Sequence, residues 1–482
     1  MATHTKQGRS PWIVFLLVTV AQFMVVLDIS ITNVALPVIK SQLNFTDSSL
    51  QWVITAYALA FGGFLLLGGR AADLYGRRTV LLTGLIAFSS TSFLIGMSSS
   101  AAELIVLRAI QGLAAAFMSP SALSIVLTTF GEGPDRNRAL AYWTLVATGG
   151  AAVGLLLGGF LTEFVNWRWN FFINVPIGIV DAILILRMVP KHEKEERNKS
   201  LDLPGATLVT SSLIAFVFGF SQGPAWGWLS FPVLGVLGLA VLLLVGFIYN
   251  ESRSSHPLMP LSIFKIRNVS GANLMMAPIY AGMLGTFFLT TLYLQNVLGY
   301  SPAIAGLSYL PFPIILAVMS TRIPKLVERY GFKRFLIIGP LLAAAGMLLM
   351  GFLPVHGDYF LNLLPTFILV PLGMGVTFMP VIAAATSGVP AHEAGLASGL
   401  ITTSQQMGGA LGLSILSGVA TSVAAASTGL DPATALVHGF NAAFFTAAGF
   451  MFFAMLLGAL VIKQPKGAQG RVSAQQIAEA MV

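Results

Sequence analysis

Two ionisable residues, Asp28 and Arg108, lie inside long apolar stretches of the sequence. A charge at the centre of a membrane costs at least about 2.5–3.5 kcal/mol, so such residues mark functional sites by default. A carboxylate held there can bind a proton or a cationic molecule, but poorly both at once, and we expect Arg108 to tune its affinity for the proton. This chemistry suits exchange across a membrane. The alternatives are a structural ion pair, or an aspartate that caps an unwound helix.

Three further acidic residues lie in or beside apolar runs. Asp181 is near the middle of its run, and we expect a structural or water-facing role for it. Glu103 and Glu163 are close to the ends of their runs, where ordinary solvation is expected.

A second group of charges fills a short link, GGRAADLYGRRTVLLTG at residues 68–84, between two apolar runs. Only 9% of the chain is charged, yet this link holds three arginines and Asp73. We expect Asp73 to pack at the N-terminal end of a neighbouring helix or to pair with an arginine. A simpler interpretation is that Arg70, Arg77 and Arg78 only hold the link on one side of a membrane.

A stripe of glycines, Gly150, Gly154 and Gly158, recurs at every fourth residue of another apolar run. That spacing places the glycines on one face of a helix, where a neighbouring helix can approach closely. Tight packing is the simple interpretation. The functional one is that this face seals a cavity against proton leakage.

A binding site for a hydrophobic compound should be apolar with a few polar groups, and aromatic faces attract organic cations. Aromatic residues form 11% of the chain, so most of them will be core or lipid-facing. The predicted substrate-binding residues are Asn33, Trp52, Tyr57, Gln111, Tyr280, Phe287, Tyr293, Gln405 and Gln406.

Other kinds of site find little support in the sequence. The chain has no cysteine, and no two of its six histidines have metal-ligand spacing, so no metal is expected. The glycine pairs lack the strand–turn–helix context of a phosphate loop, so no nucleotide or other cofactor is expected. No catalytic constellation lies at membrane depth, which argues against an enzyme. No selectivity-filter segment or ring of like charges supports a channel.

The composition predicts the element that positions these residues, a membrane-spanning helix. The 482 residues are 56% hydrophobic, whereas a soluble chain carries about 25% charge. The apolar runs are continuous rather than alternating, which favours helices over a barrel. The first run is too long for the core of a signal peptide. Fourteen spans are predicted, near residues 12–36, 50–68, 79–98, 102–126, 139–162, 168–189, 204–222, 229–250, 269–294, 303–321, 334–353, 359–381, 396–420 and 438–462.

The basic residues predict the orientation of these spans. If the N-terminus is cytoplasmic, all of the 26 lysines and arginines except Lys40, Arg108 and Arg168 fall in cytoplasmic segments. This asymmetry is the positive-inside rule, and it explains a net charge of +8 without a nucleic-acid partner. Both termini are therefore expected in the cytoplasm, in a multi-pass protein of the cell (inner) membrane.

The segment PKLVERYGFKR, residues 324–334, echoes the charged link of the first half. Glu328 precedes Gly331 by three residues, as Asp73 precedes Gly76. Internal repeats are typical of transporters. The predicted division is a six-helix bundle at 1–190, a linker at 191–203, two additional helices at 204–250, a linker at 251–268, a six-helix bundle at 269–462 and a tail at 463–482.

These motifs together resemble the major facilitator superfamily, and within it the fourteen-span drug:proton antiporter family. The charged link is similar to the superfamily loop G-x-x-x-D-x-x-G-R-R, at Gly69, Asp73, Gly76, Arg77 and Arg78. The resemblance implies that this loop is a latch that stabilises the outward-open form. It also implies the major facilitator fold, with two extra central helices between two six-helix bundles.

Three other segments carry the resemblance. LDISITNVALP, residues 27–37, is similar to L-D-x-T-I-V-N-V-A-L-P, and RAIQG, residues 108–112, to R-x-x-Q-G. WRWNFFINVPIG, residues 167–178, is similar to the W-R-W-x-F-x-I-N-x-P-I-G run of fourteen-span members.

The glycine stripe resembles the antiporter motif G-x-x-x-G-P-x-x-G-G, which ends here at Gly158 and Gly159. Leu155 stands where the motif has proline, and Gln405 stands where span thirteen of the family often has arginine. The second half is therefore expected to offer an almost uncharged cavity.

The resemblance implies a monomeric antiporter that exports hydrophobic, often cationic drugs in exchange for protons. Its partners would be the small-molecule substrate, protons and the lipid bilayer. An exporter of one natural metabolite, lipid or antibiotic is the open alternative.

Overall fold

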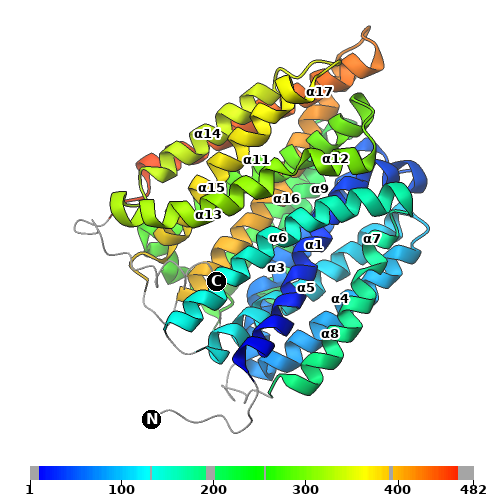
Figure 1. Cartoon of the computed structure of the whole chain (residues 1–482). Helices are drawn as coiled ribbons and strands as arrows, with labels where there is room; N and C mark the ends of the chain where they lie inside the picture. The colour runs from blue at the N-terminus through cyan, green and yellow to red at the C-terminus, as the bar shows by residue number, and fades with distance from the viewer. Residues whose placement is uncertain (1–9, 131–132, 191–200, 255–256, 390–393, 465–482) are drawn as a thin grey trace, which may run out of the picture.

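The computed structural model describes residues 10–130, 133–190, 201–254, 257–389 and 394–464. Within these ranges every regular element is a helix (Figure 1). Twelve described helices are long and apolar enough to span a membrane, and two shorter apolar stretches, Gly149–Phe164 and Phe335–Met350, lie where two other spans were predicted. The predicted all-α membrane fold is confirmed. Residues 191–200 of the linker predicted at 191–203, and residues 465–482 of the tail predicted at 463–482, lie outside the described residues.

Within the described residues, the first bundle is built from six long helices and two short ones. These helices form because lipid offers the backbone no hydrogen-bond partner, so each apolar run must satisfy its own N–H and C=O groups. The long helices are α1 (Pro11–Leu43), α3 (Trp52–Tyr75), α4 (Arg77–Met97), α5 (Ala101–Thr129), α6 (Pro134–Phe164) and α8 (Asn174–Met188), and the short ones are α2 (Asp47–Leu50) and α7 (Trp169–Phe172).

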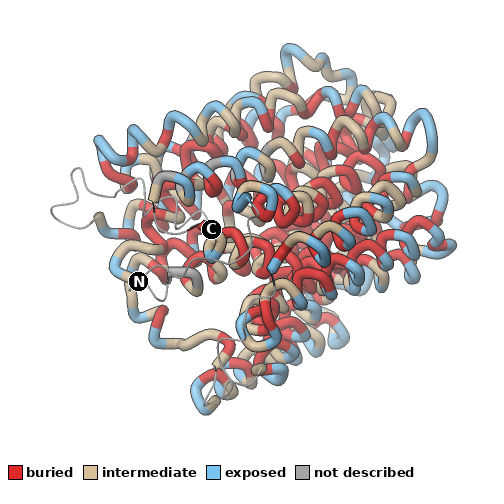
Figure 2. Tube along the Cα trace, turned by 60° about the horizontal axis from the view of Figure 1, so that its bottom comes forward, coloured by how far each residue is buried: buried red, intermediate tan, exposed pale blue. Residues whose placement is uncertain are grey.

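The second bundle repeats this arrangement in the second half of the chain. Across the molecule, buried residues lie on the facing sides of the helices and exposed residues on the outside (Figure 2), and many of the exposed residues are large and apolar. Its elements are η1 (Leu261–Lys265), α11 (Arg267–Leu292), η2 (Tyr293–Val297), α12 (Pro302–Ser308), α13 (Pro311–Tyr330), α14 (Phe335–Met350), η3 (Tyr359–Leu363), α15 (Leu364–Thr386), α16 (Ala394–Ala426) and α17 (Pro432–Leu460).

Two additional helices, α9 (Leu203–Trp226) and α10 (Phe231–Arg253), form a hairpin between the bundles in the sequence. Helix α9 packs against α3 of the first bundle and α16 of the second, while α10 packs mainly against α9. Much of α10 is exposed, as expected for a helix that faces lipid. The hairpin therefore covers the seam between α3 and α16.

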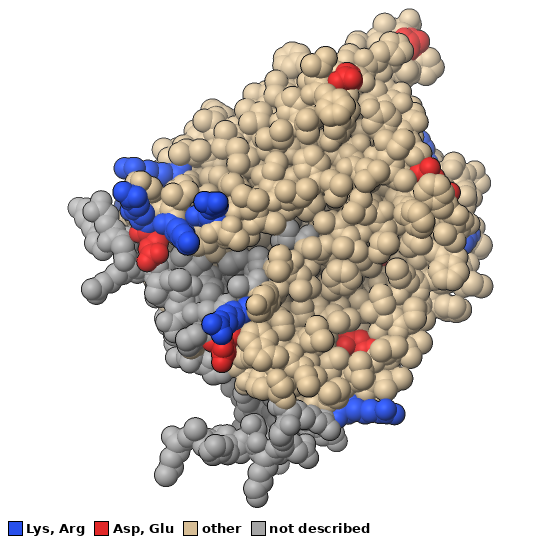
Figure 3. All heavy atoms as spheres, viewed as in Figure 1, with Lys and Arg blue, Asp and Glu red and all other residues tan. Residues whose placement is uncertain are grey.

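The two ends of the helices differ in charge. Lysines and arginines gather at the end where α3 meets α4 and where α13 ends (Figure 3). We call this the basic end and the opposite one the neutral end. Helices α6 and α13 lie close together toward the neutral end and separate toward the basic end (Figure 1).

One predicted boundary differs from the structure. The span predicted at 204–222 is longer, because α9 continues to Trp226 and ends only at Gly227, whose φ of +84° favours glycine. The span predicted at 303–321 is present as one candidate span, Pro302–Tyr330, and a turn at Tyr309 and Leu310 divides it into α12 and α13 just before Pro311, which has no backbone N–H to donate. The division into domains at the predicted residues stays a prediction.

Candidate functional site

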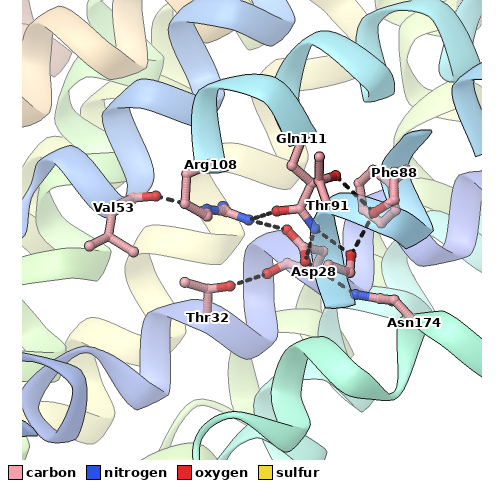
Figure 4. A network of polar contacts seen from close by, with 9 residues as sticks. Asp28, Thr32, Val53, Phe88, Thr91, Arg108, Gln111 and Asn174 are labelled. Atoms are coloured by element: carbon pink, nitrogen blue, oxygen red, sulfur yellow. Dashed lines mark hydrogen bonds and ion pairs between the residues drawn. The ribbon is translucent and has the colours of Figure 1, made fainter. Parts of the chain in front are cut away.

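Asp28 and Arg108 form a buried ion pair in the first bundle (Figure 4). Arg108 Nη1 of α5 donates to Asp28 Oδ2 of α1, and the two side chains are 1% and 0% exposed. Breaking such a pair by removing one partner costs about 3–5 kcal/mol, because the remaining charge is left uncompensated. The two ionisable residues of the apolar runs therefore contact each other directly.

Amide groups complete the shell of this pair. Gln111 Nε2 donates to Asp28 Oδ1 across 2.9 Å and lies 2.7 Å from Ser92 Oγ of α4. Asn174 Nδ2, at the start of α8, donates to the same Asp28 oxygen across 3.2 Å. Three donors thus stabilise the ionised carboxylate in a place that water does not reach.

Arg108 is also tied to the wall of the bundle. Its Nε donates to the carbonyl of Val53 on α3 across 2.9 Å, and its guanidinium lies 4.4 Å from the centre of the Tyr57 ring. The ion pair therefore links α1, α3 and α5, and a change in the charge of either partner alters contacts with all three helices.

The glycine stripe of α6 faces α1, the helix that carries Asp28. A Cβ added to Gly154 would lie 2.7 Å from Ser30 Cβ, and one added to Gly158 would lie 2.7 Å from the carbonyl oxygen of Ile31. Such distances leave no room for a side chain. The prediction that this face lets a helix approach closely agrees with the structure, and its role as a proton seal stays a prediction.

Gly159 faces the other bundle. A Cβ there would lie 2.5 Å from the carbonyl oxygen of Pro302 at the start of α12. Helix α6 passes Leu155 without a break, and the Leu155 carbonyl oxygen lies 2.4 Å from the Cβ position of Gly306. The two backbones therefore touch where the family motif has its last glycine.

Hydrogen bonds join the bundles near this contact, at the neutral end. Asn33 Nδ2 donates to Thr291 Oγ1 across 2.9 Å, and Gln295 Nε2 donates to the Val34 carbonyl across 2.8 Å. Glu163 accepts the N–H of Ala303 across 2.9 Å, so it does more than stay solvated at the end of its helix. We call these three bonds the neutral-end contacts.

The charged link forms the turn between α3 and α4 at the basic end. Gly76 has a φ of +95°, and Asp73 Oδ1 lies 3.7 Å from Arg77 Nη2. Arg78 Nη2 donates to the Leu186 carbonyl of α8 across 2.5 Å, so this arginine holds the link against the bundle. Gly331 in the second half also has a positive φ, of +75°, which supports the predicted repeat of this turn.

The predicted substrate-binding residues do not form one site. Tyr57 and Gln111 belong to the surroundings of Asp28, and Asn33 belongs to the neutral-end contacts. Trp52 lies against Phe218 of the hairpin, and Tyr293 donates to the carbonyl of Pro354 inside the second bundle.

The other four candidates also lie on the second bundle. Phe287 stacks on Tyr309, with ring centres 5.0 Å apart, and Tyr280 contacts Phe378. Gln405 and Gln406 are partly exposed on α16, where Gln406 packs on Gly62 of α3. Their part in substrate binding stays a prediction.

Sequence reasoning missed two residues near Asp28: Asn174, which donates to it, and Ser92, which bonds to its partner Gln111. Asn174 lies in the WRWNFFINVPIG run, and a polar side chain at the start of an apolar helix was the available signal. Ser92 carries no such signal, because serine is common in apolar helices, where its hydroxyl can bond to the backbone, as it does here to the Phe88 carbonyl.

The sequence as a whole matches known transporters. The family profile described as Major Facilitator Superfamily matches residues 18–413. The puromycin resistance protein pur8 of Streptomyces alboniger is 40% identical over 95% of this chain and 92% of its own length. The cephamycin export protein CmcT of Amycolatopsis lactamdurans is 39% identical over 93% of this chain and 92% of its own length. The tetracenomycin C resistance and export protein of Streptomyces glaucescens is 35% identical over 85% of this chain and 76% of its own length.

Solved structures share the fold at low sequence identity. The POT family transporter PepTSo superposes with a TM-score of 0.71 over 94% of this chain and 98% of its own, at 14% identity. The human organic anion transporter MFSD10 superposes with a TM-score of 0.61 over 94% of this chain and 100% of its own, at 17% identity.

Proposed function

Because the chain belongs to the Major Facilitator Superfamily, we propose that it exports hydrophobic, antibiotic-like compounds in exchange for protons by alternating access. The observation that carries this proposal is the buried Asp28–Arg108 pair, which is the kind of intramembrane charge that marks a transport site. The names of the relatives, which include resistance and export proteins for several antibiotics, support the class of substrate.

The orientation and the conformation are part of this proposal. The basic end is cytoplasmic, by the positive-inside rule. The neutral-end contacts then close the outer side, and the bundles separate toward the cytoplasm, which makes this an inward-facing state.

The coupling step is the protonation of Asp28. A proton on this carboxyl removes the charge that holds Arg108, while a cationic compound competes for the same carboxylate only in a state that exposes it. Each proton that enters down a 100 mV potential supplies about 2.3 kcal/mol. That energy is comparable to the cost of rearranging one buried ion pair.

The glycine stripe connects this step to the closure of the outer side. Asp28 is next to Leu27 on α1, and the Leu27 carbonyl oxygen lies 2.9 Å from the Cβ position of Gly154 on α6. Helix α6 also carries Gly159 and Glu163, which contact the second bundle. A shift of α1 is therefore transmitted to α6 by direct backbone contact, and from α6 to the neutral-end contacts.

A second candidate is an exporter of one natural antibiotic. It is favoured by the similarity to the cephamycin export protein, which this chain matches over 92% of that protein's length. A panel of drug-susceptibility measurements separates the two: a broad profile supports multidrug export, and protection against a single compound supports the specific exporter.

The deciding experiment is transport in proteoliposomes under an imposed pH gradient, with a fluorescent hydrophobic cation as substrate. Wild type should release protons when substrate is added and accumulate substrate uphill. Asp28→Asn/Arg108→Gln removes both charges, avoids an unpaired one, and should abolish uphill transport. Full uphill transport by this double variant would overturn the proposed role of Asp28. Movement of substrate without proton exchange in wild type would overturn antiport itself.

A further inference from the structure

A second acidic residue, Asp181, is buried in the same bundle with no hydrogen-bond partner among the residues that the structure describes. Helix α8 presents Asn174, Gly178 and Asp181 on its buried face, while Ile179 and Val180 are exposed. Asp181 is 3% exposed, so it does not face water as one alternative expected. Among the described residues, neither of its carboxyl oxygens has a hydrogen-bond partner.

The two buried acids therefore have opposite surroundings. Asp28 has a guanidinium and two amide donors, and this shell fits an ionised carboxylate. Asp181 has no donor in the described part of the chain, and an ionised carboxylate in that position would leave its charge uncompensated in a low-dielectric interior. The neutral acid avoids this cost, because a protonated carboxyl carries no net charge.

The charged groups on the helices around Asp181 lie elsewhere. On α1 the only facing charge in the described structure is Asp28, which contacts α8 through Asn174. Asn174 precedes Asp181 by seven residues, or about 10.5 Å along the axis of α8. On α4, Arg78 is directed to the Leu186 carbonyl, and Arg168, just before α7, donates to the carbonyls of Gly96 and Ser98.

A row of serine hydroxyls lies between the two acids. Ser89 Oγ of α4 lies 1.9 Å from the Cβ position of Gly178, so this hydroxyl sits directly on the buried face of α8. It is buried and has no hydrogen-bond partner in the described part of the chain. Ser92, one turn farther along α4, is bonded to Gln111, which is bonded to Asp28.

The path from Asp28 to Asp181 leads toward the same end of the molecule along α1, α4 and α8. Asp28 lies at the level of Asn174, and Met24 and Ser89 lie at the level of Gly178. Going from the first level to the second therefore means going to lower residue numbers on α1 and α4 and to higher residue numbers on α8. Each of these steps leads toward the basic end. Asp181 therefore lies on the basic-end side of Asp28, which is the cytoplasmic side in the proposed orientation.

We propose that Asp181 is a second proton-binding site, in series with Asp28 and on the cytoplasmic side of it, with the Ser89 and Ser92 hydroxyls lining the path between them. The proposal rests on proton-driven export as proposed above. In each cycle the neutral Asp181 first passes its own proton to the cytoplasmic solvent. The O–H bond at Asp28 then breaks as a new O–H bond forms at Asp181, so that Asp28 regains Arg108 as its partner and Asp181 is neutral again.

The first test reads the protonation of Asp181 without any transport. Infrared difference spectroscopy on purified protein in lipid, recorded between neutral and alkaline pH, detects the carbonyl stretch of a neutral carboxyl. The proposal expects such a band in wild type and in Asp28→Asn/Arg108→Gln, and its loss in Asp181→Asn. An identical band in wild type and Asp181→Asn would overturn the proposal.

The second test measures transport in the same proteoliposomes. Asp181→Asn should keep substrate binding and substrate counterflow, while pH-driven uptake falls about 100-fold, the lower range for loss of a proton-transferring group. Asp181→Glu should restore most of the uptake, and Ser89→Ala should slow it while leaving the proton stoichiometry unchanged. Full pH-driven uptake by a folded Asp181→Asn protein would overturn this proposal while proton-driven export stands. If wild type itself ignores the pH gradient, the proposed function fails first.

Discussion

Asn174 donates a hydrogen bond to Asp28 across 3.2 Å, and this bond joins α8 to α1 at the buried ion pair. The two residues are far apart in the sequence, and each lies in a segment that resembles a different motif. The contact shows that these motifs meet at one carboxylate.

We predict that Asn174→Leu reduces proton-driven export. The substitution removes one charge-assisted hydrogen bond, of about 1.5 kcal/mol at this length, and leaves an apolar group beside the carboxylate. The measurement is the initial rate of dye efflux from vesicles under a fixed pH gradient. Asn170→Leu is the matched control, since Asn170 is an equally buried amide that donates to Thr162 instead. Equal losses in both variants would show that the effect is only structural.

Removal of one partner of the ion pair should destabilise the protein more than removal of both. Asp28→Asn and Arg108→Gln each leave an uncompensated charge and should cost about 3–5 kcal/mol, whereas the double variant should be closer to wild type. Thermal unfolding in detergent measures all four proteins. Additive losses in the double variant would contradict a direct energetic coupling of the pair.

We predict that Gly159→Ala opens the neutral end. Its new Cβ would lie 2.5 Å from the backbone of Pro302, and backbone atoms cannot yield as a flexible side chain can. The chain has no cysteine, so spin labels at Val165→Cys and Leu430→Cys report this opening as a longer distance. Gly149→Ala is the control on the same helix, because no described atom of a neighbouring element lies within 4 Å of its Cβ position. An unchanged distance in Gly159→Ala would contradict the assignment of this contact as the outer closure.

Asp73→Asn should impair transport without a matching loss of stability. Asp73 is 50% exposed and its pair with Arg77 spans 3.7 Å, so the pair contributes at most about 1 kcal/mol. Asp135→Asn is the matched control, because Asp135 pairs with Arg138 across the same distance at 68% exposure. The measurements are thermal unfolding and dye efflux. If both variants transport at the wild-type rate, the latch role of Asp73 is excluded.

The hairpin should lose stability in acid through Asp202, which caps α9 just outside its span. Burial raises the pKa of this carboxyl, but hydrogen bonds from the Gly205 N–H and the Asn250 amide hold it below its usual value. A lowered folded pKa gives stability that is present above about pH 4, the unfolded value, and is lost as pH falls through the folded pKa.

Asp202→Ala should therefore cost about 1 kcal/mol at pH 7, the usual effect of losing an N-cap. The difference from wild type, followed by thermal unfolding, should shrink as the pH falls below about 4. Asp431→Ala is the comparison, since Asp431 caps α17 at an exposed position and should matter less. A difference that is constant down to acid pH would contradict a role of the Asp202 charge.

Much of the fold could be predicted from the sequence. The continuous apolar runs determine helices, because lipid leaves the backbone no other partner, and the placement of basic residues predicts how the helices alternate. The spacing of Gly150, Gly154 and Gly158 determines that they share a face, because helical geometry is local.

Only the tertiary structure decided what these faces meet. It placed α1 on the glycine stripe, Asn174 on Asp28, and Ser89 on Gly178, contacts between residues far apart in the chain. It also separated the predicted substrate-binding residues, because a residue's type does not reveal whether its side of a helix faces lipid, a neighbouring helix or a cavity. That choice depends on how helices distant in sequence pack together, and no local pattern encodes it.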